Sequence, residues 1–205
     1  MISEEYQFLF IHIPKTAGNS VGQQLQAYSE DRLVTLAAHQ DGVERFEVRH
    51  PRYPITKHST LTDYKALLAP ALFRRLFKFA TLRNPWERMI SFYFSPHRGV
   101  TQWDPGAFRA LVERTPPARH YLLTDASGPM DKPLDADIDC LLRFETLEQD
   151  FQRVSTRLGL PWRGLPRYNA SQRNHYTHYY DDELIAVVED RFGEEIAFGD
   201  YRFGG

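Results

Sequence analysis

Two β-branched and aromatic runs in this chain end abruptly at polar loops, and a helix-forming segment follows each of them. The first run, residues 6–13 (YQFLFIHI), stops at Pro14, and the second, residues 77–82 (FKFATL), is followed by Arg83-Asn84-Pro85. Runs of this kind are typical of buried strands. A strand that leads through a tight loop into a helix, twice in one chain, predicts βαβ units around a largely parallel sheet.

The other elements follow from apolar periodicity and from proline and capping signals. Helices are expected over residues 18–28, 62–76, 84–94, 104–113, 146–158 and 181–192, and further strands over residues 32–38 and 138–144. Pro70 should divide the second of these helices, because proline removes a helical hydrogen bond. Asn84 and Asp104 each precede a proline and should cap the helices that start there. No boundary divides the chain, so residues 1–205 are expected to form a single domain.

The composition excludes several classes of protein. The 205 residues include 25 Lys and Arg against 27 Asp and Glu, a net charge of −2, so no overall positive field would attract nucleic acid. The single cysteine, Cys140, lies in an apolar run and is expected to be a buried, inert thiol. There is no zinc-ligand spacing, no signal peptide and no apolar stretch of about twenty residues. The cytoplasm is therefore the expected location, and nothing indicates the oligomeric state.

The loop between the first strand and the first helix has the features of an anion-binding site. Its residues 14–20 (PKTAGNS) combine small side chains, which let backbone amides approach a phosphate, with a helix N-terminus that directs free N–H groups toward it. Lys15 adds a positive charge, and Thr16, Asn19 and Ser20 add hydroxyl or amide donors. The loop is not a Walker A motif, in which lysine follows the glycines, because here lysine precedes the only glycine.

A second anion site is predicted at Arg83. This residue follows the second strand, and ligands of open α/β sheets bind at the carboxyl ends of strands. In the next helix, Arg88 and Ser91 are three residues apart and share a face. Two interpretations of Arg88 stay open: it forms a phosphate cradle with Ser91, or it pairs with an acidic side chain. Two anion sites beside one sheet predict a ligand that is phosphorylated at both ends.

These segments resemble the motifs that bind 3′-phosphoadenosine 5′-phosphosulfate (PAPS) in PAPS-dependent sulfotransferases. Residues 14–20 are similar to the 5′-phosphosulfate loop of the membrane-associated, carbohydrate-modifying (Golgi-type, family 2-like) group. Residues 83–93 (RNPWERMISFY) resemble its 3′-phosphate motif, R-[DEN]-P-x-x-R-x-x-S-x-Y, and residues 143–147 (RFETL) and 179–182 (YYDD) resemble later landmarks. The resemblance implies a three-layer, P-loop-like α/β fold with a central, largely parallel sheet flanked by helices. It also implies metal-independent transfer of a sulfuryl group from PAPS to a hydroxyl, on a carbohydrate.

The resemblance implies roles for single residues as well. Lys15 would contact the bridging oxygen and stabilise the leaving 5′-phosphate, while Arg83 and Ser91 would bind the 3′-phosphate. Residues 58–64 (HSTLTDY) resemble a segment of the related uronyl 2-O-sulfotransferases that opens with a histidine, so His58 matches as the general base. The 5′-phosphate would be held by the backbone amides of Thr16, Ala17, Gly18, Asn19 and Ser20.

Several assignments stay open at this point. His12, which precedes the phosphate loop, and Glu87 are alternatives to His58 as the base. Arg173 is expected to close over the nucleotide, with an ordinary loop arginine as the alternative. Asn84 stands where the sulfotransferase motif more often has Asp or Glu, but its capping role survives that change.

The acceptor and the competing functions complete the expectations. The loops that would line the acceptor site, residues 41–54, 96–104 and 125–133, carry no transferable pattern, and a small metabolite, a phenol or a protein tyrosine are alternatives to a sugar. A P-loop-like small-molecule kinase or nucleotide hydrolase would need a lysine after the glycines and an acid for magnesium, and the sequence has neither in place. A non-catalytic nucleotide-binding module would fit the phosphate motifs equally well.

Overall fold

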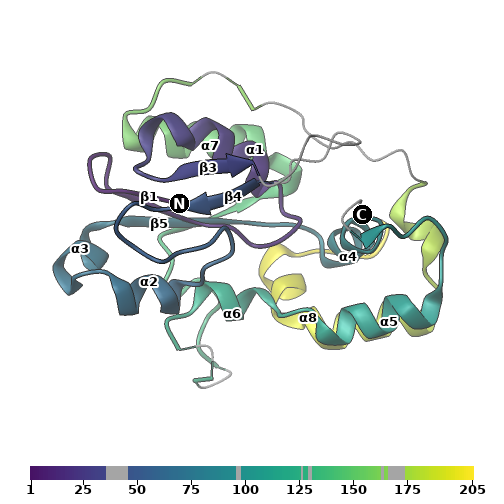
Figure 1. Ribbon diagram of the computed structural model, residues 1–205. Coiled ribbons are helices and arrows are strands. Elements are labelled where there is room, and N and C mark those ends of the chain that lie inside the picture. Colours follow the sequence, from purple (N-terminus) through teal and green to yellow (C-terminus); the bar gives the residue numbers. More distant parts are fainter. Residues whose placement is uncertain (36–45, 96–97, 126, 129–130, 163, 166–173) are drawn as a thin grey trace.

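A four-stranded, mostly parallel sheet forms the centre of the protein (Figure 1). The computed structural model describes residues 1–35, 46–95, 98–125, 127–128, 131–162, 164–165 and 174–205. The strand order is β1-β2-β5-β6, with β1 (Ile2–Ser3), β2 (Phe8–Ile11), β5 (Phe77–Leu82) and β6 (Cys140–Arg143). Strands β2, β5 and β6 run parallel, and only β1 is antiparallel to its neighbour.

Strands β2 and β5 carry the two sequence runs that predict the sheet. All four residues of β2 are buried, as are five of the six in β5, which is the pattern of parallel strands covered on both faces. In their register Phe8 pairs with Phe77 and Ile11 with Ala80. The two strands therefore end side by side, and this brings the loops after Ile11 and after Leu82 to the same edge of the sheet.

Helices cover both faces of this sheet. In Figure 1, α1 (Gly18–Leu25) and α7 (Leu147–Leu158) lie on one side, and α2 (Leu61–Leu67), α3 (Pro70–Arg75) and α6 (Ala118–Leu122) lie on the other. Beyond the carboxyl ends of the strands, α8 (Asp182–Gly199) packs against both α4 (Pro85–Tyr93) and α5 (Pro105–Arg114). No helix within the described ranges is long and apolar enough to cross a membrane.

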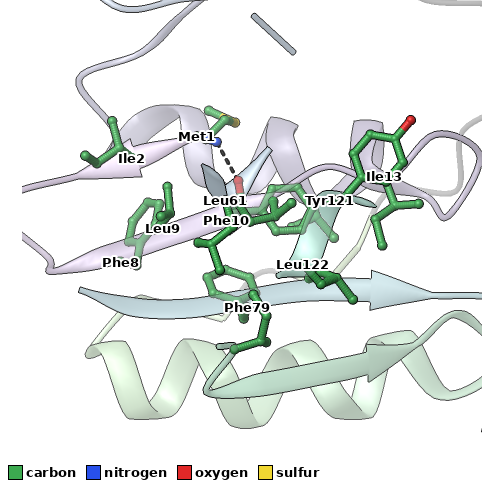
Figure 2. Packing of buried hydrophobic residues seen from close by; sticks show 14 of the residues in the cluster. Met1, Ile2, Phe8, Leu9, Phe10, Ile13, Leu61, Phe79, Tyr121 and Leu122 are labelled. Atoms are coloured by element: carbon green, nitrogen blue, oxygen red, sulfur yellow. Dashed lines mark hydrogen bonds between the residues drawn. The ribbon is translucent and has the colours of Figure 1, made fainter. Parts of the chain in front are cut away.

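The buried side chains form two clusters. The larger one joins the sheet to the helices on its faces, and Figure 2 shows Phe8, Phe10 and Phe79 of neighbouring strands packed with Leu61 of α2 and Leu122 of α6. The rings of Phe10 and Phe79 have centroids 5.2 Å apart. The smaller cluster joins α4, α5 and α8, and it includes Trp86, Met89, Ile90, Phe108, Val188 and Phe192. The expected P-loop-like α/β fold, with a largely parallel central sheet flanked by helices, is confirmed.

The structure adds elements that the sequence patterns do not predict. Strand β3 (Arg32–Thr35) starts where a strand is expected, but it pairs antiparallel with β4 (Phe46–Arg49) in a separate two-stranded sheet. The short helix α6 is also unforeseen, and α8 continues past its expected end at Phe192, where the backbone is locally non-helical. Pro70 divides α2 from α3 as expected, and it occupies the first position of α3.

Candidate functional site

The loop after β2 has a backbone suited to holding an anion. Lys15 and Ala17 both adopt left-handed backbone conformations, with φ of 68° and 67°, which cost energy for residues other than glycine. Ala17 is the N-cap of α1, and no side chain in the described part of the chain caps that helix. A tight turn at an uncapped helix N-terminus presents backbone N–H groups to a ligand, as a phosphate or sulfate requires.

Gly18 is required in this loop by a close contact with His12. A Cβ atom on Gly18 would lie 2.0 Å from Cδ2 and 2.2 Å from Nε2 of the His12 ring. The ring itself is buried between Phe10 and His58, with centroid separations of 6.1 and 4.7 Å. The glycine of the phosphate loop therefore makes room for a neighbouring side chain.

The loop side chains differ in burial and in the groups that they can offer to a ligand. The Thr16 hydroxyl, fully buried, donates to the carbonyl oxygen of Ile13 at 2.9 Å. Thr16 can therefore offer an anion its backbone N–H but not its hydroxyl hydrogen. Asn19 and Ser20 lie in the first turn of α1, the former half-buried and the latter buried, and Lys15 is half-buried.

Arg83 connects the second predicted site to this loop. Its Nη1 donates to the carbonyl oxygen of Lys15 at 3.2 Å, so the two segments meet although 68 residues separate them in the chain. Glu87, one turn along α4, forms an ion pair with Arg83, in which Nη2 lies 2.8 Å from Oε1 and Nε lies 3.3 Å from Oε2. The Glu87 carboxylate is therefore held by Arg83, and its role as an alternative base stays a prediction.

Residues 143–147, to which the sequence alone gives no role, contact Arg83 and the start of α4. The ring of Phe144 lies against the guanidinium, with Cζ 3.9 Å from the ring centroid. Next to it, Glu145 accepts hydrogen bonds from the Asn84 backbone N–H at 2.8 Å and from the Tyr201 hydroxyl at 3.1 Å. The Asn84 side chain caps α4 as predicted, accepting from the backbone N–H of Trp86 and Glu87. Residues 144–145 thus position the start of α4.

The two arginines of the second motif point in different directions. Arg88 is only 3% exposed and lies between α4 and α8, with its guanidinium over the Phe192 ring at 4.7 Å and 4.0 Å from the Glu195 carboxylate. Burial lowers the pKa of Arg88 and raises that of Glu195, and each charge opposes the shift of the other. Of the two interpretations left open, pairing with an acid is therefore the correct one. Ser91 is half-buried on α4, and its predicted role at the 3′-phosphate stays a prediction.

His58 contacts His12, which directly follows β2 and lies just before the candidate anion-binding loop. Its Nδ1 donates to the carbonyl oxygen of His12 at 2.9 Å, and its ring lies edge-on to the His12 ring. Two residues after His58, a capping box between Thr60 and Asp63 fixes the start of α2. His58 keeps an exposed edge, but desolvation of its covered face lowers its pKa, partly offset by the hydrogen bond to His12. Deeper burial, together with the positive charges of His58 and Lys57, lowers the pKa of His12 well below its usual value.

The remaining predicted residues contribute less to this geometry. Arg173 lies outside the described residues, so its expected contact with the nucleotide stays a prediction. Cys140 is half-buried and not fully buried as expected, and burial raises its pKa, which lowers the fraction of reactive thiolate at neutral pH. Across the described ranges, no group of three or more His, Cys, Asp or Glu side chains could hold a metal ion.

Comparison with known proteins gives one match. A family model described as "Sulfotransferase family" matches residues 1–201, nearly the whole chain. No curated protein and no solved structure matches the chain.

Proposed function

Because this chain belongs to the sulfotransferase family, we propose that it transfers a sulfuryl group from PAPS to a hydroxyl of a carbohydrate acceptor. The observation that carries the proposal is the hydrogen bond between Arg83 Nη1 and the Lys15 carbonyl oxygen. It joins the loop that leads from β2 to the uncapped N-terminus of α1 to the arginine that follows the neighbouring strand, β5. Two linked anion sites fit a nucleotide with charged groups at its 5′ and 3′ positions, which distinguishes PAPS from ATP.

The residues present fit such a nucleotide in their chemistry. The turn at residues 15–18 and the start of α1 offer backbone N–H groups for the 5′-phosphosulfate, and Lys15 offers a positive charge. Arg83 and the hydroxyl of Ser91 on α4 are the donors for the 3′-phosphate. PAPS would supply the activated sulfuryl group, whose transfer requires a base at the acceptor and a positive charge at the leaving oxygen.

The hydrogen bond of His58 defines which of its nitrogens can act as that base. A carbonyl oxygen only accepts, so the hydrogen of the neutral ring must be on Nδ1, where it is donated to His12. Nε2 is then left with a lone pair. A lowered pKa keeps the ring neutral at neutral pH, so this lone pair is available to accept a proton. The carbonyl of His12 thus orients the base from a position two residues before the loop that would bind the 5′-phosphosulfate.

These roles give a balanced displacement at sulfur. The acceptor hydroxyl forms a new bond to sulfur while its proton passes to Nε2 of His58. The bond between sulfur and the bridging oxygen breaks, and its electron pair remains on the 5′-phosphate, where Lys15 and the amides of the α1 N-terminus stabilise the charge. The sugar identity of the acceptor rests on the family resemblance of the two phosphate motifs.

Calorimetric titration of nucleotides tests this function. Adenosine 3′,5′-bisphosphate should bind tightly in the presence of a metal chelator, and AMP and ATP should bind more weakly. A preference for ATP, or binding that requires magnesium, would instead support a kinase or nucleotide hydrolase. Tight binding of the bisphosphate without sulfuryl transfer to any hydroxyl acceptor would leave a non-catalytic binding module.

The assignment of the base has its own test. His58→Asn retains an N–H that can donate to the His12 carbonyl but removes the basic nitrogen. We expect it to lower turnover by about 10²- to 10⁴-fold, the range for loss of a general base, with nucleotide affinity unchanged. The wild-type rate should fall on acidification with an apparent pKa below the ordinary histidine value of about 6.5. Nearly full activity in the Asn variant would move the role to another residue.

A further inference from the structure

We propose that Glu87 is a positioning residue for the nucleotide 3′-phosphate, holding the Arg83 guanidinium in the orientation that binds it. The inference rests on the function proposed above and deepens it. Glu87 occupies a variable position of the 3′-phosphate motif, so the motif assigns it no role. Its contacts with Arg83 are the reason to assign one.

Glu87 contacts Arg83 through both of its carboxylate oxygens, and the pair is largely shielded from solvent. The two carboxylate oxygens meet Nη2 and Nε of the guanidinium at 2.8 and 3.3 Å, which is the side-on, bidentate geometry. The Arg83 side chain is only 10% exposed and that of Glu87 30%, so solvent screens this pair less than an ordinary surface ion pair. Such a contact restricts rotation of the guanidinium about its own axis.

The remaining donors of Arg83 match what a phosphate needs. A guanidinium has five N–H groups. Glu87 accepts from two of them, and the Lys15 carbonyl accepts from one on Nη1. One N–H on Nη1 and one on Nη2 remain, the number used in a bidentate contact with phosphate oxygens. One face of the guanidinium lies against the Phe144 ring, so the group is held at two edges and one face.

Glu87 is itself well placed to hold this orientation. It lies in the first turn of α4, where the positive end of the helix dipole stabilises a carboxylate. Its backbone N–H donates to the side chain of the N-cap, Asn84, and the Asn84 N–H is in turn held by Glu145. A fixed helix start therefore carries the carboxylate that orients the arginine. The same helix carries Ser91, the second predicted ligand of the 3′-phosphate.

A carboxylate beside a phosphate-binding arginine could instead occupy the phosphate site, and that role would reverse the expected effect of removing Glu87. If the carboxylate were a stand-in for phosphate, it would have to leave Arg83 when the nucleotide binds, and its removal would strengthen binding. The geometry favours positioning, because Glu87 takes the Nε edge and leaves a donor on each terminal nitrogen. Loss of a group that orients a metal ligand typically costs about 10- to 100-fold in affinity or activity, and we take the same scale for a group that orients a phosphate-binding arginine.

Calorimetry on Glu87→Ala and Glu87→Gln separates these roles. Glu87→Ala should weaken binding of adenosine 3′,5′-bisphosphate by about tenfold or more and change AMP binding little, since AMP lacks the 3′-phosphate. Glu87→Gln keeps one acceptor oxygen and should recover part of the loss. In turnover, the KM for PAPS should rise more than kcat falls. Glu183→Ala is the matched control, because Glu183 also lies in the first turn of a helix and pairs with an arginine, Arg109, at 2.7 Å.

Three outcomes with the Glu87 variants would overturn the inference alone. Tighter binding of the bisphosphate to Glu87→Ala would show that the carboxylate competes with phosphate. Equal losses for the bisphosphate and AMP, without rescue by Gln, would show a role in folding alone. Wild-type selectivity retained in Glu87→Ala would remove Glu87 from the site and leave the proposed function intact. A wild-type protein that does not prefer the bisphosphate to AMP would overturn the proposed function, and the inference with it.

Discussion

Gly18→Ala is a one-carbon change whose consequences can be worked out from the structure. The new Cβ would lie 2.0 Å from the His12 ring, whereas such atoms are hardly ever closer than 3.0 Å. The ring or the helix start must therefore move by about 1 Å, and the ring is already packed between Phe10 and His58. The backbone at Gly18 lies outside the left-handed region, so the clash alone opposes alanine.

The expected cost combines two opposing contributions. Forcing extra volume into a packed site costs about 1–3 kcal/mol. Alanine recovers about 0.5–1 kcal/mol over glycine within a helix. The balance is a loss of about 1 kcal/mol, which lowers the melting temperature of a chain of this size by about 2–4 °C. Turnover should fall further, by up to about 100-fold, because the His58 ring packs against the His12 ring and a shift of about 1 Å there misplaces His58.

Thermal denaturation and turnover of a double-mutant cycle test this reasoning. In a His12→Ala background the clash is removed, so Gly18→Ala should cost nothing there or gain slightly. Gly193→Ala in α8 is the matched control, since its Cβ would meet no atom within 4 Å and should stabilise the protein slightly. An unchanged melting temperature for Gly18→Ala, or a loss that persists without the His12 ring, would refute the close-contact argument.

Three further perturbations follow from the site and the core. Lys15→Ala should cut turnover by about 10²- to 10³-fold, as loss of a charge-stabilising group does, and a rate close to wild type would remove it from the leaving-group role. Arg88→Ala should cost about 3–5 kcal/mol in denaturant unfolding, because Glu195 stays buried without its partner, while selectivity for the 3′-phosphate survives. Stability should decline as pH falls below about 6.5, since burial lowers the pKa of His12 and His50 and the unfolded chain then binds more protons; urea midpoints that rise on acidification would contradict this.

The elements with strong local signals were predictable because few residues decide them. The runs in β2 and β5 are buried on both faces, so their apolar character is continuous and easily read. The start of α4 was equally clear, since the Asn84 side chain and Pro85 satisfy the first turn without help from distant residues. In contrast, β4 is a four-residue strand of mixed character that is stabilised by pairing with β3, and α6 is a five-residue helix. Neither is long enough to show a period.

The identity of the site depends on both levels of structure. From the sequence alone, Lys15 and Arg83 could be named as candidates, because a strand end followed by a helix start is a local signal of an anion site. His58 has no such local signal, and only the resemblance of residues 58–64 to a known family segment pointed to it.

Only the tertiary structure decided which of two arginines five positions apart faces the site. Arg83 meets the Lys15 carbonyl, whereas Arg88 is buried against Glu195, more than 100 residues further along the chain. Local patterns specify where strands and helices begin and end, but the partner of a charged side chain is chosen by the packing of distant elements.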